Sequence, residues 1–143
     1  MVLIDKNIEI RFVNRWPKDD IVDLYKAGGW WKETYDPSNI KNLIKGSYAF
    51  AVVINIKGNK AIGMGRILSD GVSDAYFQDL IILPEYRGKG YGKKLVKFLI
   101  DYCLSKEIYW IGLISEPRQD IFYSKMNFYK MKDYVPMKYK IED

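Results

Sequence analysis

The sequence contains no histidine and a single cysteine, Cys103. Without histidine the chain lacks the usual general base of hydrolases and the commonest zinc ligand, which excludes a Ser-His-Asp mechanism and a zinc site. One cysteine cannot form an intramolecular disulfide, so the sequence fits a reducing compartment in which Cys103 is buried as a small apolar residue. We expect no metal in the functional site.

Long apolar runs are missing as well. The N-terminal stretch carries the charged side chains of Asp5, Lys6, Glu9 and Arg11. It therefore offers no apolar segment for a signal peptide, and no later stretch approaches the length of a membrane span. These absences predict a cytoplasmic protein without membrane association. The chain has 143 residues, of which 48% are hydrophobic, so we expect one domain over residues 1–143.

The charge is mildly basic. Twenty-three Lys and Arg residues against eighteen Asp and Glu give a net charge of +5. This balance is compatible with an anionic ligand or an RNA partner, and equally with a solubilised surface.

Apolar periodicity predicts a mixed α/β chain. Alternation predicts strands over 8–12, 47–56, 60–68, 75–83, 108–114 and 134–141, and the helical spacing of apolar residues predicts helices over 19–29, 37–46, 92–103 and 117–126. The order is one strand, two helices, an antiparallel run of strands and then strand, loop, helix and strand. The fold class is therefore α/β, with a mixed, mostly antiparallel sheet, a helical crossover and helices on both faces.

The stretch PEYRGKGYGKKL, residues 84–95, lies between a predicted strand and a predicted helix. Its glycines permit positive φ and close backbone approach, and the helix start aims unpaired N–H groups at one point. Arg87, Lys89, Lys93 and Lys94 add positive charge. The loop is therefore a predicted phosphate site, and its alternative is a glycine turn before a solvated basic helix.

The sequence of this loop does not match two other phosphate-binding motifs. The Walker pattern needs glycine at Arg87 and Ser or Thr at Lys94. The dinucleotide fingerprint needs a third glycine at Lys93 or Leu95. Nucleoside triphosphate hydrolysis and dinucleotide binding are both disfavoured.

The run Arg87-Gly88-Lys89-Gly90-Tyr91-Gly92 resembles the Q/R-x-x-G-x-G/A loop of the GNAT superfamily of acyl-CoA-dependent N-acyltransferases. That family places the loop between a strand and an amphipathic helix and later has a Y-x-x-x-G-F motif. Residues 123–128 fill this second motif, with Asn127 in place of glycine. Asn also tolerates the left-handed conformation. More narrowly, residues 63–90 look like plant serotonin N-acetyltransferases and their bacterial relatives, including Arg66, Asp70 and Asp79.

The resemblance implies acetyl-CoA as co-substrate and direct attack of an amine on its thioester. It implies that pantetheine pairs with Ile81, Ile82 and Leu83 and that a backbone N–H near Ile82 stabilises the tetrahedral oxyanion. The pyrophosphate is then expected on the loop, formed by Arg87, Gly88, Lys89, Gly90, Tyr91, Gly92 and Lys93.

Tyr123 holds the family's position for the acid that protonates the departing thiolate. A tyrosine with a pKa of about 10 stays protonated at neutral pH and can donate to a thiolate whose thiol has a pKa near 8.5. The alternative is an aromatic side chain packed on the sheet.

The base that deprotonates the amine is expected at Asp79. This carboxylate interrupts an otherwise apolar strand, where a charge needs a task or a partner. Its alternative is a salt bridge or turn anchor. Asp70 is the second candidate, with a turn role as its alternative. Some family members have a Glu earlier on this strand, where this sequence has Tyr76.

The acceptor pocket is expected around Trp30, Trp31 and Tyr35, because the family builds it from the first two helices and their loop. Aromatic faces with the carboxylates of Glu33 and Asp36 suit a cationic or aromatic amine, although tryptophan pairs also form cores and interfaces.

The sequence therefore predicts an N-acetyltransferase acting on a small-molecule primary amine. The alternatives are a protein or aminoacyl-tRNA acetyltransferase, a non-catalytic CoA-binding module and an RNA-binding domain. No RNA-binding motif is present, which disfavours a nucleic-acid partner. Dimers are frequent among relatives, so a homodimer is a further possibility.

Overall fold

A computed structural model describes residues 1–142. It divides the chain into a first compact unit, Met1–Leu113, and a second that begins at Ile114. The strands of the first unit are β1 (Val2–Asp5), β2 (Ile8–Phe12), β3 (Ala49–Asn55), β4 (Lys60–Ser69), β5 (Asp74–Ile82) and β6 (Trp110–Leu113). Its helices are α1 (Lys18–Ala27), α2 (Ile40–Gly46) and α3 (Tyr91–Ser105), with the short 3-10 helices η1 (Pro37–Asn39) and η2 (Pro84–Tyr86).

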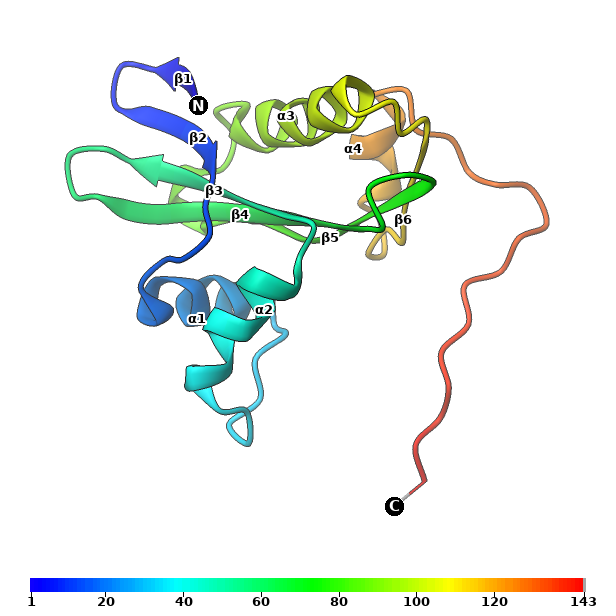
Figure 1. Ribbon diagram of the computed structural model, residues 1–143, viewed down its shortest axis with the longest axis horizontal. Coiled ribbons are helices and arrows are strands. Elements are labelled where there is room, and N and C mark those ends of the chain that lie inside the picture. The colour runs from blue at the N-terminus through cyan, green and yellow to red at the C-terminus, as the bar shows by residue number, and fades with distance from the viewer. Residues whose placement is uncertain (143) are drawn as a thin grey trace. The chain divides into compact units, whose positions relative to one another are not determined.

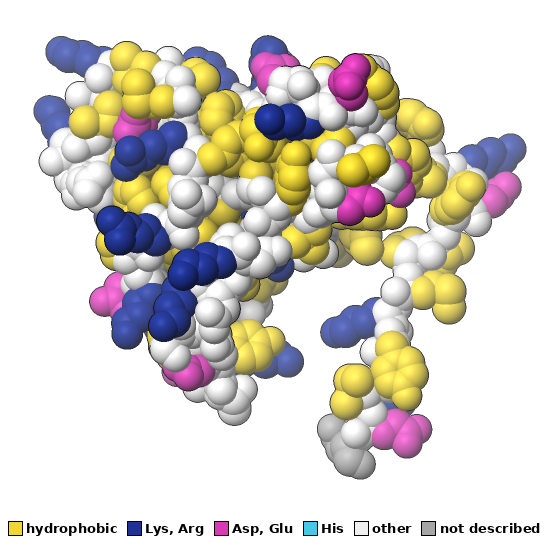
Figure 2. Space-filling view, in the orientation of Figure 1, with side chains coloured by type: hydrophobic (Ala, Val, Ile, Leu, Met, Phe, Trp, Pro, Cys, Tyr) yellow, Lys and Arg dark blue, Asp and Glu magenta, His cyan; other side chains and the backbone are white. Residues whose placement is uncertain are grey.

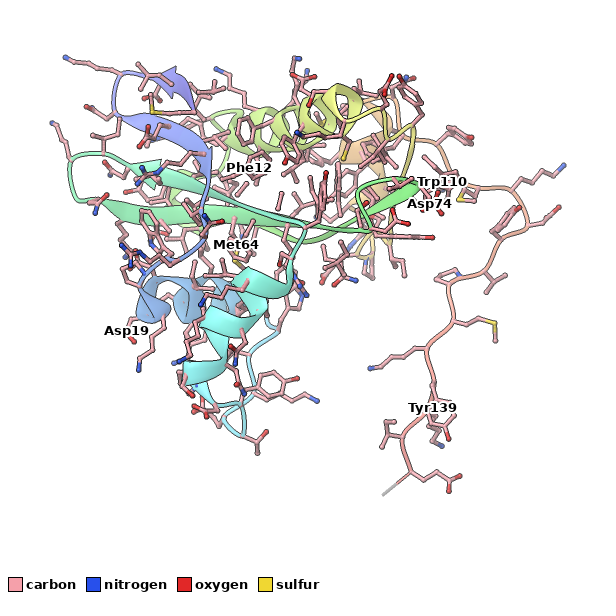
Figure 3. The ribbon with its side chains drawn as sticks, in the orientation of Figure 1. Phe12, Asp19, Met64, Asp74, Trp110 and Tyr139 are labelled. Atoms are coloured by element: carbon pink, nitrogen blue, oxygen red, sulfur yellow. The ribbon has the colours of Figure 1, made fainter. Side chains whose placement is uncertain are left out.

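The strands form one six-stranded sheet in sequence order (Figure 1). Every neighbouring pair from β1 to β5 is antiparallel, and β5 and β6 are parallel. Asp74 and Trp110, which lie side by side in Figure 3, are the first residues of that parallel pairing. Helix α3 makes the crossover between them. The predicted mixed, mostly antiparallel sheet is confirmed.

Helices cover both faces of this sheet. Figure 1 shows α3 on one face and α1 with α2 on the other. Helix α3 buries the side chains of Leu95, Val96, Leu99 and Cys103 and leaves Lys93, Lys94 and Lys97 exposed. Because these apolar residues recur at helical spacing, the buried stripe faces the sheet and the lysines face solvent. The predicted helices on both faces are confirmed.

The core lies on the central strands. Residues 49–54 of β3 are all buried, because this strand has neighbours on both edges and helices over the sheet. At the β2 side, Phe12 points toward α3 (Figure 3), and its ring centroid lies 4.7 Å from that of Phe98. Aromatic contacts of this kind fix α3 over the sheet.

Two parts of the chain differ from the prediction. Strand β1, which pairs with β2 at an exposed edge, is short and was not expected. The strand predicted over 134–141 is wrong, because residues 134–142 form neither helix nor strand. Apolar residues alternate there, but Val135, Met137, Tyr139 and Ile141 are 73%, 90%, 83% and 77% exposed. A strand needs a hydrogen-bonded neighbour as well as a pattern.

Over residues 114–142, the second unit contains one short helix, α4 (Asp120–Ser124). After α4 the chain turns at Asn127, whose φ of 68° lies in the left-handed region. The amide of Phe128 donates to the carbonyl oxygen of Tyr123 at 3.2 Å. Across residues 1–142, none of the helices combines the length and apolar character needed to cross a membrane.

Candidate active site

Strand β5 contains a bulge at its centre. Met64 is opposite Ile81 and Arg66 is opposite Gln78, so the single residue Gly65 faces two residues, Asp79 and Leu80. Asp79 has a φ of 60°. An extra residue in the left-handed region bends a strand and re-aims its side chains. The predicted strand is present as β5, but its pairing with β4 is interrupted at Asp79.

Two glycines on β4 make room for the bulged strand. A Cβ at Gly65 would lie 2.6 Å from Leu80 Cδ2, and a Cβ at Gly63 would lie 2.5 Å from Ile82 Cδ1. A Cβ at either position would require the side chain of Ile82 or Leu80 to shift. The glycines therefore allow Leu80 and Ile82 to lie across β4.

Just before the bulge, β5 separates from β6. The β5–β6 pairing ends at Phe77 and Leu113, so residues 78–82 have no strand of the first unit on that edge. The amide of Leu83 donates to the Ile62 carbonyl at 2.8 Å on the β4 side. Since successive residues of an antiparallel strand alternate in direction, the N–H and C=O of Ile82 point to the open edge. Arg87 Nε donates to the Ile82 carbonyl at 2.8 Å, which agrees with that direction.

The glycine loop follows directly and leads into α3. Gly88 and Gly90 have φ values of 79° and 83°. A Cβ at either position would meet no atom within 4 Å, so the conformation and not the space requires glycine. Helix α3 begins at Tyr91 and has no side-chain cap, which leaves its first N–H groups directed into the loop.

The charged side chains of the loop are exposed. Arg87, Lys89 and Lys93 are all on the surface, and Lys89 Nζ lies 5.8 Å from the centroid of the Tyr86 ring. Uncapped N–H groups, the positive end of a helix dipole and these cations together suit a bound diphosphate.

The start of α3 is anchored to the N-terminal strand. The buried Tyr91 donates its hydroxyl proton to a carboxylate oxygen of Asp5, and Lys94 Nζ donates to the Ile4 carbonyl at 3.0 Å. Tyr91 therefore contributes to the loop through its backbone, while its side chain fixes the helix. This anchor was not predicted, because Asp5 lies 86 residues away.

Basic side chains are not confined to the loop. Figure 2 shows Lys and Arg side chains gathered over the part of the molecule that α1 and α2 form, with acidic groups among them. The exposed lysines of these two helices are Lys18, Lys26, Lys41 and Lys45. The net charge of +5 is therefore spread over the surface.

Asp79 lies in a polar cluster. Its Oδ2 accepts a hydrogen bond of 2.7 Å from the Tyr25 hydroxyl and one of 2.7 Å from Arg66 Nε. The side chains of Arg66 and Asp79 are only 17% and 21% exposed. The structure contains the salt bridge that was the alternative to a base. Burial, and then the negative charge of Asp79, raise the pKa of Tyr25 far above its usual value, so Tyr25 acts as a donor and not as an acid.

Asp70, the second candidate base, occupies a turn. Its carboxylate accepts hydrogen bonds of 2.8 Å from the amides of Val72 and Ser73 and from the Ser73 hydroxyl. These bonds hold the pKa of Asp70 below its usual value. The geometry matches its alternative role as a turn residue.

Tyr123 lies on α4 in the second unit. Its ring centroid is 5.0 Å from that of Phe122 and 5.8 Å from that of Phe128. Partial burial and the negative charge of Glu116 raise the pKa of the Tyr123 hydroxyl above its usual value. The hydroxyl therefore keeps its proton at neutral pH, which suits a donor.

The predicted acceptor residues follow α1. Trp30 folds back onto its own helix end, 6.1 Å from the Tyr25 ring, and its ring would lie 2.6 Å from a Cβ at Gly28. Trp31 and Tyr35 form a separate edge-to-face pair with centroids 5.4 Å apart. Tyr35 is 46% exposed, whereas Trp30 and Trp31 are half-buried. Asp36 caps η1 through the Ser38 amide.

Comparison with known proteins identifies the family. The model of the acetyltransferase (GNAT) family matches residues 13–130, which include the bulge, the loop and α4. The chain belongs to the GNAT acetyltransferase family. An uncharacterized N-acetyltransferase of Pyropia yezoensis is 31% identical over 118 residues, or 81% of this chain and 67% of that protein. The chloroplastic GCN5-related N-acetyltransferase 2 of Arabidopsis thaliana is 30% identical over 79% of this chain.

The chain spans only part of some GNAT relatives, since the match covers 45% of the Arabidopsis protein. Among solved structures, a GNAT family acetyltransferase from Streptococcus pneumoniae superposes with a TM-score of 0.77 and 27% identity, covering 95% of this chain and 99% of that one. The family and the fold support an acetyltransferase that uses acetyl-CoA as co-substrate.

Proposed function

We propose that this chain transfers the acetyl group of acetyl-CoA to the primary amine of a small molecule. The observation that carries the proposal is the open edge of β5 at residues 78–82, which leads directly into a glycine loop and an uncapped helix start. A pantetheine arm can pair with such an edge as an added strand, and a diphosphate can bind at its end.

The donor side would work mainly through backbone groups. Residues 81–83 would bind the pantetheine amides, and residues 87–93 would bind the diphosphate. Acetyl-CoA supplies a thioester, which is an activated acyl group. The Ile82 N–H, which points to the open edge, would stabilise the oxyanion that forms when the amine adds.

Tyr123 would protonate the departing thiolate. Its raised pKa keeps the hydroxyl protonated at neutral pH, so that it can donate to the thiolate. Asn127, which has a positive φ, makes the turn that follows the helical segment carrying Tyr123.

Asp79 would accept the proton that the ammonium form of the acceptor must lose. Its two hydrogen bonds from Tyr25 and Arg66 both end on Oδ2, so Oδ1 is the oxygen that we propose for this step.

The acceptor would bind beside the aromatic pair Trp31 and Tyr35. The faces of these aromatic rings and the exposed carboxylate of Glu33 on the same loop would suit a cationic amine.

The test is thiol release from acetyl-CoA over a panel of small amines, peptides and an aminoacyl-tRNA, with CoA affinity measured by calorimetry. Turnover with small amines supports the proposal. Turnover only with peptides or aminoacyl-tRNA would assign the acceptor to those classes. CoA binding without turnover would indicate a binding module, and RNA affinity that falls steeply with salt would indicate the RNA alternative.

Tyr123→Phe tests the acid. We expect kcat to fall by about 10²-fold or more while CoA affinity is retained, because the hydroxyl acts on the leaving group only. Tyr129→Phe is the matched control, since Tyr129 is 85% exposed in the same unit. Unchanged turnover in Tyr123→Phe would remove Tyr123 from this role.

A further inference from the structure

We propose that Tyr25 and Arg66 are positioning residues that clamp Asp79 from two elements and so hold the bulge of β5 in the shape that opens its edge. The functional part of this inference rests on the proposed acetyl transfer.

The bulge needs an external support. Asp79 has a φ of 60°, a conformation that a residue with a Cβ adopts only at a cost, although Asp tolerates it better than most. The strand has already lost its β6 partner at this point, since the β5–β6 pairing ends at Phe77. A strained residue beside a one-sided ladder stays in place only when surrounding groups determine its position.

Tyr25 and Arg66 supply that support from two different elements. The Tyr25 hydroxyl reaches Asp79 Oδ2 from α1, and Arg66 Nε reaches the same oxygen from β4, each at 2.7 Å. Hydrogen bonds to an ionised acceptor are stronger than neutral ones. Because one bond comes from a helix and the other from the neighbouring strand, they fix both the position and the direction of the carboxylate.

Arg66 extends this support beyond the carboxylate. Its Nη2 donates to Gln78 Oε1 at 3.3 Å, so one guanidinium contacts two successive residues of β5 at the bulge. Its Nη1 lies 3.5 Å from Ser47 Oγ, at the end of α2. The planar guanidinium therefore ties β5 to the segment after α2.

Tyr25 links the support of the bulge to the predicted acceptor loop. Tyr25 is 7% exposed in the last turn of α1, and the Trp30 ring packs against it with the ring centroids 6.1 Å apart. Its raised pKa keeps the hydroxyl a donor over the working pH range. A change at the end of α1 can thus reach the bulge through one buried side chain.

The first test measures how well the bulge is held in place and does not depend on catalysis. Hydrogen exchange of the amides in residues 78–82 is measured on the full chain for Tyr25→Phe and Arg66→Gln. We expect exchange to accelerate by about tenfold or more, the size expected for loss of a hydrogen bond to a charged group. Tyr48→Phe and Arg11→Gln are the controls, because neither side chain contacts Asp79, and both should leave these amides unchanged.

The second test distinguishes the positioning role of Tyr25 and Arg66 from the proposed role of Asp79 as the base. Tyr25→Phe and Arg66→Gln should raise KM for acetyl-CoA by about tenfold, because the edge that receives pantetheine loses its shape, and they should retain the acidic limb of the pH–rate profile. Asp79→Asn tolerates a positive φ and keeps an acceptor for Tyr25. It should instead lower kcat and abolish that limb.

Arg66→Lys provides a variant that keeps the charge. It should restore part of the exchange protection that Arg66→Gln loses, and its KM for acetyl-CoA should be lower than that of Arg66→Gln. This comparison holds even if Arg66→Gln itself folds poorly.

The outcomes distinguish the two proposals. Unchanged exchange in residues 78–82 in both Tyr25→Phe and Arg66→Gln would overturn the clamp, whatever the activity of the protein. Absence of thiol release from the unsubstituted protein would overturn the proposed function, while accelerated exchange in the same variants would still support the clamp.

Discussion

At the scale of single residues, Cys103 shows how burial sets chemistry. Its thiol is completely buried in α3 and makes no disulfide. Burial raises the pKa of Cys103 to about 11, from an unfolded value of 9.0. The folded protein therefore resists forming the thiolate, and the thiol serves as a small apolar group in the core.

This shift makes a prediction about stability and pH. Because the folded pKa is raised, the contribution of Cys103 is complete below pH 9 and is lost as the pH rises toward about 11. We expect the free energy of unfolding, measured with urea, to fall between pH 8 and pH 10.5. This fall should be smaller for Cys103→Ala than for the unsubstituted protein. Equal declines in the two proteins would contradict the assignment.

At the scale of elements, the glycine loop and the start of α3 determine the predicted diphosphate site. Both Gly88 and Gly90 are left-handed, with open space where a Cβ would lie. A side chain there would not collide with the protein, so its cost is conformational.

Gly90→Ala is therefore expected to weaken CoA binding. The left-handed conformation costs a non-glycine residue roughly 1–2 kcal/mol, and this corresponds to about 5- to 30-fold in affinity if the loop must keep its shape to bind. Calorimetry with CoA measures the change. Gly58→Ala is the matched control: it lies in the β3–β4 turn, its φ is not left-handed, and no atom lies within 4 Å of its Cβ position. Equal affinities for the two variants would contradict the role of the loop.

At the scale of the whole molecule, the sheet and its helices hold nearly all of the buried apolar side chains. All of the fully buried large residues lie between Ile10 and Ile108. The apolar side chains of residues 135–141 are more than 70% exposed.

Deleting residues 135–143 should therefore leave the stability of the protein about unchanged. The expectation rests on the large exposed residues Val135, Met137, Tyr139 and Ile141, because removing exposed side chains typically changes the free energy of unfolding by about 0.5 kcal/mol or less. Thermal unfolding followed by circular dichroism measures this, with Leu99→Ala as a core control expected to cost about 2–5 kcal/mol. A drop for the truncated chain comparable to that of Leu99→Ala would show that the segment packs against the protein or a second copy.

Much of the fold could be predicted because its causes are local. The alternation in β2 to β5, the amphipathic pattern of α3 and the glycines of the loop each act within a few neighbouring residues. The left-handed turn at Asn127 also follows from its residue type. Family resemblance added the loop's ligand and the candidate acid, which remain predictions for the residues concerned.

Other features depend on residues that are distant in sequence. Tyr25 meets Asp79 across 54 positions, and only the packing of α1 on the sheet brings them together. The bulge, and the room that Gly65 leaves for Leu80, depend on the β4–β5 register. Sequence alone determined which segments can form strands, helices and a left-handed loop, because backbone preference and apolar periodicity are short-range. Only the tertiary structure decided which strand gained a partner, where β5 parts from β6 and what Asp79 binds, because those are pairings between elements.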